Sequence, residues 1–191
     1  MIIDIDSPGG LLESSLNMAR KLRETKWAHT VSYVKHEALS GAAIMALGCD
    51  EIIMAEHAAI GDAGPIVLNE AFMFEHAPEK VRTDLARKVR DLAEAKDRPP
   101  ALAEAMVDHK LVVYRTKNKE TGDIYFLTDA EIKSMDDPKQ WETLKPVRET
   151  LNDKFLEING RRAVEMKFAQ GVVNDVSDLD KYYDLDRQPL M

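Results

Sequence analysis

The spacing of apolar residues predicts alternating strands and helices over the first part of the chain. Short apolar or β-branched runs at residues 2–5, 30–34 and 51–54 predict three strands. Apolar residues between 11 and 23 recur at three- and four-residue spacing, which predicts a helix there. The small, apolar segment 40–47 predicts a second helix that is tightly buried.

A proline marks the next change in pattern. Pro78 is typical of a helix start, and the apolar positions that follow it at helical spacing predict a helix to about Ala95. A shorter helix is predicted at residues 101–107. Residues 58–65, rich in glycine and alanine, are predicted to form a loop.

The region after this helix has a different character. Segments 111–115 and 124–127 flank a polar turn that contains glycine, and they predict a β-hairpin. Thr128 is followed three residues later by Glu131, the spacing of a helix capping box. Residues 136–146 are polar, so we interpret this region as an insertion or accessory element.

The last part of the chain is predicted to return to the main fold. Helices are expected at residues 147–156 and 162–170, and a turn into a strand at 171–173. The tail, 177–191, is acidic and expected to fray. Strands that alternate with helices indicate an α/β architecture with mostly parallel strand pairing and right-handed connections.

These elements suggest one core interrupted by an insertion. The expected organisation is a core over residues 1–109, an insertion of a β-hairpin plus helices over 110–156, a return of the core over 157–176, and an acidic tail over 177–191.

Composition and charge argue against several classes of protein and of site. The chain has 191 residues, 45% of them hydrophobic, with a formal net charge of −8. This acidic balance argues against a general nucleic-acid binder, which usually has a basic face. The single cysteine, Cys49, excludes an intramolecular disulfide and a cysteine-based zinc site. No segment approaches the roughly 18 apolar residues of a membrane helix, and no basic leader is visible at the start.

Two segments carry candidate chemistry. The first is Asp6-Ser-Pro-Gly-Gly10, which follows a predicted strand. One interpretation is a tight turn that needs positive φ. The other is that backbone N–H groups at Gly9 and Gly10 polarise a carbonyl, because an oxyanion hole needs donors aimed at developing negative charge.

The second segment is Ala38-Leu-Ser-Gly-Ala-Ala43. Ser40 stands where a helix begins, and serine is a good N-cap residue. Alternatively, its Oγ is a nucleophile at a helix N-terminus, with the Gly41 N–H contributing to an oxyanion hole.

A serine nucleophile needs a base. None of the five histidines lies in a recognisable motif, although His36 is close to Ser40 in sequence. A desolvated lysine is the other candidate. Both Lys80 and Lys88 lie on the helix after Pro78, and periodicity places Lys88 nearer the apolar stripe.

Taken together and in order, several segments resemble the Clp protease and signal peptide peptidase A superfamily, and within it the NfeD-type membrane-bound serine protease branch. The resemblance covers roughly residues 1–108 and 157–175. It rests on Asp4-Ile-Asp-Ser-Pro-Gly-Gly10, Ala38-Leu-Ser-Gly-Ala-Ala43, Leu47-Gly-Cys-Asp-Glu-Ile-Ile-Met-Ala55, Ile60-Gly-Asp-Ala-Gly-Pro65, Lys80 with Leu92-Ala-Glu94 and Arg98, and Ala163 with Gly171-Val-Val173.

The resemblance implies an α/β fold of the Clp-protease/crotonase-like type, built of repeated ββα units, with an inserted hairpin/helix element. It also implies a Ser–Lys dyad. Ser40 matches the family nucleophile, and Lys80 matches its general base, which overrides the preference for Lys88 from periodicity. Gly9, Gly10 and Gly41 match the segments of the oxyanion hole.

Two departures from the family pattern stand out. The family has a further strand and helix before the Asp-Ser-Pro-Gly-Gly motif, so the domain is expected to be N-terminally incomplete, with an exposed sheet edge. Asp62 is an acid in a loop expected near the site, and pairing with Lys80 would weaken that base by raising its pKa.

The expected function is that of a serine endopeptidase acting on hydrophobic peptide segments, including those of membrane proteins. A catalytically inactive scaffold or peptide-binding module is the alternative, and an acyl-CoA enzyme of the crotonase type is a third. Self-association into a homo-oligomer is expected by resemblance. No metal, no cofactor and no nucleic acid are expected, and the compartment stays open between a membrane-associated and an extracytoplasmic location.

Overall fold

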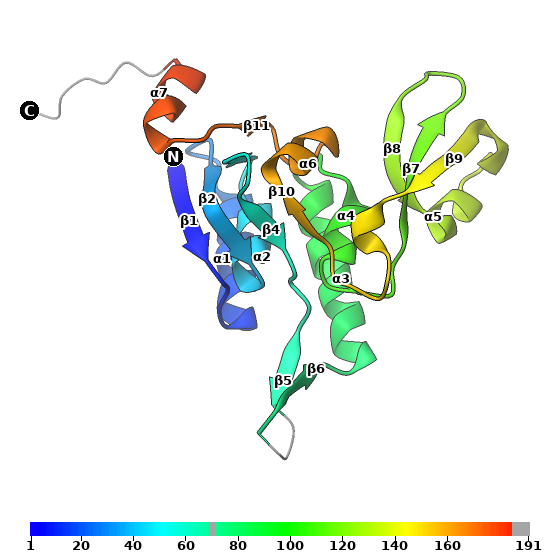
Figure 1. The fold of residues 1–191 in the computed structure, drawn as a ribbon, viewed down its shortest axis with the longest axis horizontal. Helices are drawn as coiled ribbons and strands as arrows, with labels where there is room; N and C mark the ends of the chain where they lie inside the picture. Colours follow the sequence, from blue (N-terminus) through cyan, green and yellow to red (C-terminus); the bar gives the residue numbers. More distant parts are fainter. Residues whose placement is uncertain (69–71, 185–191) are drawn as a thin grey trace, which may run out of the picture.

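The computed structural model describes residues 1–68 and 72–184, and its centre is a sheet of six strands (Figure 1). The strands are β1 Ile2–Ser7, β2 Val31–Leu39, β3 Glu51–Met54, β4 Ala59–Gly61, β10 Glu157–Asn159 and β11 Gly171–Val172.

The long strand β2 organises this sheet. β1 lies parallel to one side of it, whereas β3 and β4 share its other side. β3 pairs with the first half of β2, and β4 pairs with the last residues before Leu39. β11 extends the sheet parallel to β3, and β10 runs antiparallel to β4. The mostly parallel pairing expected from the sequence is confirmed.

Helices pack around the sheet. They are α1 Leu12–Glu24, α2 Gly41–Leu47, α3 Glu79–Glu94, α4 Pro100–Ala105 and α6 Gly160–Glu165. In Figure 1, α1 and α2 lie behind β1 and β2, and α3 and α4 lie to the right of them. Small residues allow α1 and α2 to approach closely, and a Cβ built on Gly48 would lie 2.3 Å from the Ala19 carbonyl oxygen. The apolar stripe predicted on the helix after Pro78 is buried in this core through Leu85, Val89 and Leu92.

A second, smaller apolar cluster lies against Tyr33 of β2. It brings Tyr33 and Ile53 together with Leu179 of α7 Leu179–Tyr182, close to the short 3-10 turn Val176–Asp178. The prediction that the tail frays is therefore wrong for residues 177–184, because Leu179 is completely buried. The rest of the predicted tail, 185–191, lies outside the described residues.

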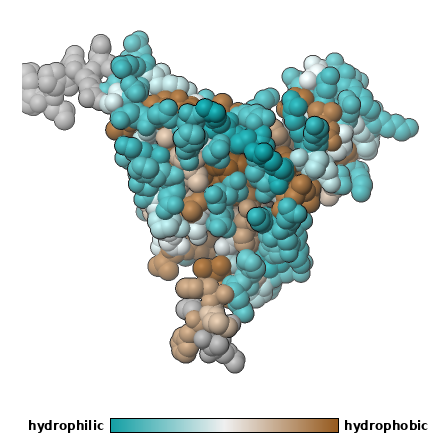
Figure 2. Space-filling view, in the orientation of Figure 1, coloured by the Kyte–Doolittle hydropathy of each residue, from teal (hydrophilic) through white to brown (hydrophobic). Residues whose placement is uncertain are grey.

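A hairpin of two short strands projects from the body of the molecule (Figure 1). β5 Ile66–Leu68 pairs antiparallel with β6 Phe74–His76. The side chains of Phe72 and Phe74 are 87% and 71% exposed, and Figure 2 shows apolar surface gathered over this arm. The sequence did not predict either strand.

A separate three-stranded antiparallel sheet follows the main helices. β7 Val113–Asn118 lies between β8 Ile124–Thr128 and β9 Trp141–Pro146. The predicted hairpin is confirmed, and so is the capping box that begins α5 Asp129–Ser134, where the Thr128 Oγ1 accepts from the Glu131 N–H. β9 lies within residues 136–146, which are polar and were not predicted to form a strand.

Other predicted elements need correction. Residues 147–156 form no α-helix; only a 3-10 turn, Arg148–Thr150, is present, because the segment must extend to reach β10. The helix predicted at 162–170 is α6, which ends at Glu165. The loop predicted at 58–65 contains the short strand β4, and a 3-10 turn also forms at Pro138–Gln140.

Among the described residues, no helix combines the length and the apolar character required to cross a membrane.

Candidate active site

Ser40 occupies the turn where β2 ends and α2 begins. Its backbone angles are φ 53° and ψ −126°, far from those of a helix or a strand. Its N–H donates to the Gly61 carbonyl at 3.0 Å, and its own carbonyl accepts from the N–H groups of Ala43 and Ile44 at 3.1 and 3.3 Å. Hydrogen bonds on both sides therefore hold the backbone of Ser40 in this conformation.

The side chain of Ser40 does not explain that conformation. Its hydroxyl makes no capping hydrogen bond and has no other hydrogen-bond partner within the described part of the chain. A capping serine would have extended φ and accept an N–H of the first turn. Ser40 therefore occupies the N-cap position of α2, as one interpretation expected, but its side chain does not cap the helix. Non-glycine residues with positive φ are costly and concentrate at functional sites.

Gly9 lies directly against Ser40. Its φ of 128° is unfavourable for any other residue, and a Cβ at this position would lie 2.6 Å from the Ser40 Cβ and 3.0 Å from its Oγ. The Ser7 Oγ is 3.2 Å from both the N–H and the carbonyl oxygen of Gly9, which fixes the turn. The interpretation of this segment as a tight turn with positive φ is confirmed, whereas the oxyanion-hole interpretation stays a prediction.

Two backbone donors next to Ser40 have no partner. The N–H groups of Gly10 and Gly41 find no hydrogen-bond acceptor among the residues that the structure describes. The segments are adjacent, since a Cβ on Gly41 would lie 3.2 Å from the Gly10 carbonyl oxygen. No atom lies within 4 Å of a Cβ on Gly10, so this position is open. The Gly9 N–H, in contrast, faces the Ser7 Oγ.

A cavity of about 350 Å³ adjoins these glycines. Gly9, Gly10 and Gly41 line it together with the apolar side chains of Met18 on α1 and Met45 on α2. Neither methionine was predicted from the sequence to belong to the site. Helical spacing offered a signal, because Met45 follows Gly41 by one turn and so shares its face of α2.

Within the described residues, no hydrogen bond joins either candidate lysine to Ser40. Lys80 is the second residue of α3, is exposed, and makes no hydrogen bond or ion pair with a described residue. Lys88 lies 2.7 Å from Asp84 in an ion pair, and its side chain is 40% exposed. It lines a groove with Arg20 of α1 rather than the cavity beside Ser40.

The histidines also lie apart from the Ser40 hydroxyl. The Nδ1 atom of His36 is 2.8 Å from Asp6, and the His36 side chain is 65% exposed. No hydrogen bond joins a histidine of the described region to Ser40. Cys49 is not an alternative nucleophile, because burial raises the pKa of its thiol to about 11.

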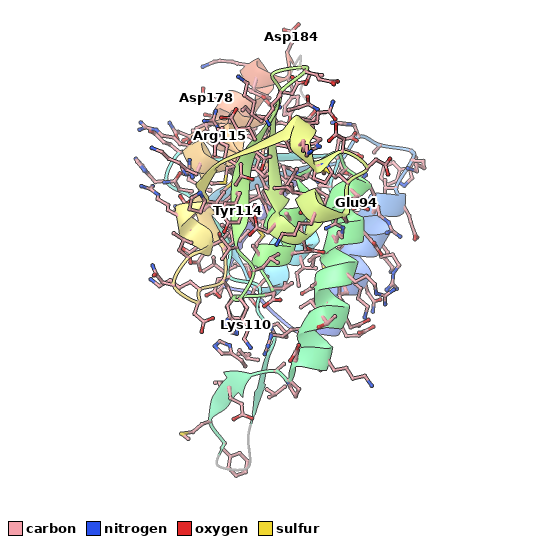
Figure 3. The ribbon with its side chains drawn as sticks, turned by 90° about the vertical axis from the view of Figure 1, so that its right-hand side faces the viewer. Glu94, Lys110, Tyr114, Arg115, Asp178 and Asp184 are labelled. Carbon is pink, nitrogen blue, oxygen red and sulfur yellow. The ribbon has the colours of Figure 1, made fainter. Side chains whose placement is uncertain are left out.

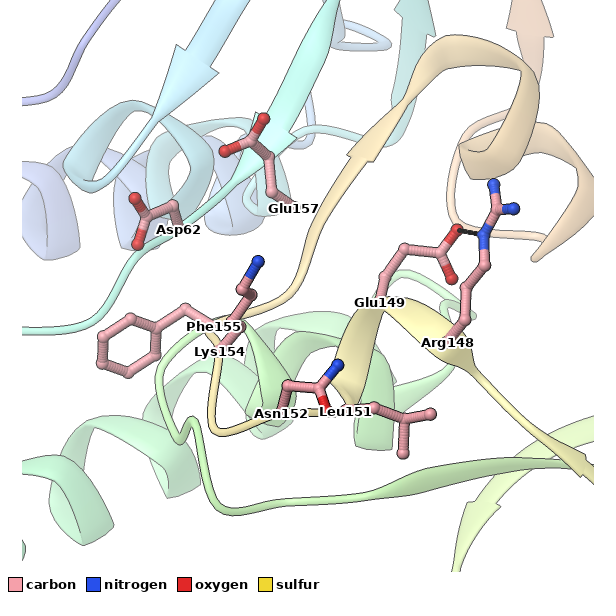
Figure 4. Close-up of a pocket in the computed structure, with 8 residues that line it drawn as sticks. All are labelled: Asp62, Arg148, Glu149, Leu151, Asn152, Lys154, Phe155 and Glu157. Atoms are coloured by element: carbon pink, nitrogen blue, oxygen red, sulfur yellow. Dashed lines mark hydrogen bonds and ion pairs between the residues drawn. The ribbon is translucent and has the colours of Figure 1, made fainter.

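Asp62 borders a different cavity, of about 530 Å³, between the end of β4 and residues 148–157 (Figure 4). In Figure 4 the Lys154 ammonium points to the side of the cavity where Asp62 and Glu157 lie. No ion pair joins Asp62 to Lys80 in the described structure, so the expected weakening of the base by Asp62 has no structural support. Lys154 was not identified from the sequence, since an isolated lysine carries no signal.

Arg98 fixes the helix that carries this site. Its guanidinium is buried and donates to the carbonyls of Leu47, Cys49, Asp50 and Phe168 at 3.0 to 3.2 Å. Burial lowers the pKa of Arg98 to about 10, so the side chain stays charged at neutral pH. Because Leu47 ends α2, Arg98 anchors the opposite end of the helix from Ser40.

Comparison with known proteins places this geometry in context. Residues 1–137 match the family model described as NfeD1b, N-terminal domain. The chain is 28% identical over 181 residues to the membrane protein NfeD1b of Bacillus subtilis, which covers 95% of this chain and 33% of that protein. It is 43% identical over 61 residues to an uncharacterized protein, MJ1495, of Methanocaldococcus jannaschii, covering 32% of this chain and 20% of that one.

Solved structures share the fold. A mutant of the 1510-N membrane-bound stomatin-specific protease, in complex with a substrate peptide, matches with a TM-score of 0.64 and 18% identity over 94% of this chain and 63% of its own. The 1510-N membrane protease specific for a stomatin homolog, from Pyrococcus horikoshii, matches with a TM-score of 0.54 and 16% identity over 95% and 61% of the two chains. The expected Clp-protease-like α/β fold is confirmed.

The chain spans about a third of the length of the Bacillus protein and less than two thirds of these protease chains. The family model, however, covers well over half of the present chain. The chain therefore belongs to the family of NfeD1b N-terminal domains.

Proposed function

We propose that this domain is a serine endopeptidase in which Ser40 is the nucleophile. The conformation of Ser40 is the observation that carries the proposal. A serine on a sharp turn between a strand and a helix, with positive φ and an unpartnered hydroxyl, is the arrangement that exposes a nucleophile in other hydrolases. Its neighbours supply the second requirement, since the Gly10 and Gly41 amides border one cavity and have no acceptor among the described residues.

The proposed reaction is acyl transfer. The Ser40 Oγ attacks the scissile carbonyl while a general base takes its proton. The N–H groups of Gly10 and Gly41 stabilise the negative charge that develops on the carbonyl oxygen, and Gly9 permits the close approach of the loop. The base then protonates the leaving amine and activates the water that releases the acyl-enzyme.

Lys80 is the proposed base, on the strength of the family resemblance. At the start of α3 it is exposed and pairs with no described residue, so its side chain is free to reorient within the described structure. A lysine acts as a base only when it loses its proton, which desolvation favours. We therefore propose that the bound peptide, or the arm β5–β6 next to α3, covers Lys80 during the reaction.

The substrate class follows from the cavity and the relatives. Met18 and Met45, with Ile5 and Leu11, form the apolar part of the lining of the cavity beside the glycines, which Asp4 and Asp6 also border. The structurally similar 1510-N proteins are described as membrane proteases specific for a stomatin homolog. We propose that this domain cleaves hydrophobic peptide segments, including segments of membrane proteins, and that it acts as a homo-oligomer. The division into core, insertion and tail stays a prediction.

A catalytically inactive scaffold is the alternative, and one observation favours it. No hydrogen bond joins Lys80, Lys88 or a histidine to the Ser40 hydroxyl within the described residues. A domain of this kind would hold a peptide without cleaving it.

Peptide hydrolysis by single variants separates the two functions. We expect Ser40→Ala and Lys80→Ala to lower the rate on an apolar fluorogenic peptide by about 100-fold or more, the range for loss of a nucleophile or base. Lys88→Ala is the matched control, a lysine of the same helix, and should leave the rate unchanged. Full activity in Ser40→Ala would overturn the assignment, and binding without hydrolysis by the unaltered chain would support the scaffold.

A further inference from the structure

A groove of about 850 Å³ lies beside the three-stranded sheet and shares no lining residue with the cavity beside Gly9, Gly10 and Gly41. Both apolar and charged side chains line this groove. Phe126, Leu144 and Val147 contribute apolar surface, and Arg115, Lys145 and Arg148 contribute positive charge. Arg162 and Glu165 also line the groove, and they form an ion pair with each other. Figure 3 faces this sheet and shows Arg115 on β7.

The positive charges of this groove are available to a ligand. Arg115 and Lys145 are exposed and make no hydrogen bond or ion pair with any residue in the described ranges. Arg148 is 78% exposed, and its Nε lies 3.1 Å from the Glu149 carboxylate. That carboxylate is already engaged by Arg162, whose Nε and a terminal nitrogen lie 2.8 and 3.0 Å from its two oxygens.

The same ion pair makes one wall of the groove rigid. Arg162 belongs to α6 and Glu149 to the 3-10 turn after β9, so their bidentate contact ties these two elements together. Partial burial opposes ionisation of Glu149, but the hydrogen bonds from Arg162 lower its pKa below the ordinary value. The wall is therefore present before any ligand arrives.

We propose that this groove binds a short acidic peptide segment of another protein, with at least one large apolar side chain. Carboxylates of the segment would pair with Arg115, Lys145 and Arg148, because guanidinium groups bind carboxylates in a bidentate manner. The apolar side chain would cover Leu144, which is half-buried in the free protein. This inference does not depend on catalysis at Ser40.

The overall charge of the protein favours a peptide over other anionic ligands. The formal net charge is −8, so an extended polyanion such as a nucleic acid or an anionic membrane is repelled by most of the surface. A segment of a few residues meets only the local positive field of the groove. The apolar side chains of the groove, Phe126, Leu144 and Val147, would also find no apolar partner on the phosphate backbone of a nucleic acid.

Fluorescence anisotropy with a labelled peptide of alternating glutamate and leucine tests the proposal. The full chain should bind it saturably, and more weakly as salt rises. The double variant Arg115→Glu/Lys145→Glu should weaken binding at least about tenfold, since it replaces two attractive charges with two repulsive ones. Leu144→Ser should also weaken it, whereas Leu144→Met should retain it.

The matched control is Lys26→Glu/Lys110→Glu, which changes the net charge by the same amount at two other exposed lysines. Figure 3 shows Lys110 well away from Arg115. This control should bind the peptide like the unaltered chain. The proposal is overturned if the unaltered chain does not bind, if the control loses as much affinity as the groove variant, or if a lysine–leucine peptide, a single-stranded RNA or an anionic vesicle binds the groove more tightly.

Discussion

Ser40 adopts a backbone conformation that suits glycine. This conformation is unfavourable for serine, and no hydrogen bond of its side chain to a described residue offsets it. The Ser40 hydroxyl caps nothing, and its φ of 53° lies in a region that disfavours residues with a Cβ. The surrounding structure must impose it, and it does so through the hydrogen bond from the Ser40 N–H to Gly61 and those that the Ser40 carbonyl accepts. Such imposed strain is typical of a functional residue.

Two variants that both lack the hydroxyl measure this strain. Ser40→Gly should be more stable than Ser40→Ala by about 1 kcal/mol, because only glycine adopts this φ without penalty. Denaturant unfolding of the two proteins provides the comparison. Equal stability, or a more stable alanine variant, would show that the backbone at Ser40 is not strained.

The two glycines of the neighbouring turn should respond differently to the same change. Gly9→Ala places a Cβ 2.6 Å from that of Ser40 at positive φ, and we expect it to lower the free energy of unfolding by about 1 to 3 kcal/mol. Gly10→Ala meets open space and should change it by less than about 0.5 kcal/mol. Thermal or urea unfolding distinguishes them, and equal losses at both positions would contradict this geometry.

Among the elements, Asp50 joins the start of β3 to the end of α3 through an ion pair, and to the start of β2 through hydrogen bonds from Thr30. The Asp50 carboxylate lies 2.5 Å from the Lys96 Nζ and accepts from the N–H and Oγ1 of Thr30 at 2.7 and 2.8 Å. Partial burial raises the pKa of Asp50, but the hydrogen bonds from Lys96 and Thr30 outweigh it and hold that pKa well below its usual range.

This shift predicts the pH dependence of stability. Because the pKa of Asp50 is lower in the folded than in the unfolded chain, its contribution is complete above about pH 4 and is lost as the pH falls further. Asp50→Asn should destabilise the protein at pH 7, and the difference should shrink below about pH 4. Urea unfolding between pH 7 and pH 2 measures this, and a constant difference would refute it.

The sequence predicted those elements whose residues carry their own signal. α1 and α3 were predicted because their buried faces repeat with helical spacing, and α5 because Thr128 and Glu131 form its cap. β5 and β9 were missed because their sequences lack a strand pattern, and they form strands only by pairing with β6 and β7. Ile66 and Val67 of β5 are exposed, and Trp141–Pro146 of β9 is polar and mostly exposed. A three-residue strand has no periodicity to detect.

At the scale of the whole molecule, the arm β5–β6 is the most conspicuous apolar surface. Phe72, Met73 and Phe74 are each more than 60% exposed, which is unusual for large apolar side chains close together. We expect this arm to mediate self-association. Phe72→Ser/Phe74→Ser should lower the average mass in sedimentation velocity, whereas Trp27→Ser, at an isolated side chain 80% exposed, should not. Unchanged association in the double variant would exclude the arm.

The candidate site was predictable only in part, for a geometric reason. Ser40, Gly9, Gly10 and Gly41 lie on the segments that connect β1 to α1 and β2 to α2, and parallel pairing of the two strands brings these segments together. Lys80 follows the projecting arm instead, so strand pairing does not determine its distance from Ser40. Its role was inferred from family resemblance, and it stays a prediction.

Covalent labelling of Ser40 is the most direct test of the central claim. The chain would be treated with a fluorophosphonate probe, and the modified residue located by mass spectrometry of its peptides. A single label on Ser40, absent from Ser40→Ala, strongly reduced in Lys80→Ala and retained in Lys88→Ala, is the predicted result. A folded chain that takes up no label, or carries it on another residue, would contradict the assignment of Ser40 as a nucleophile.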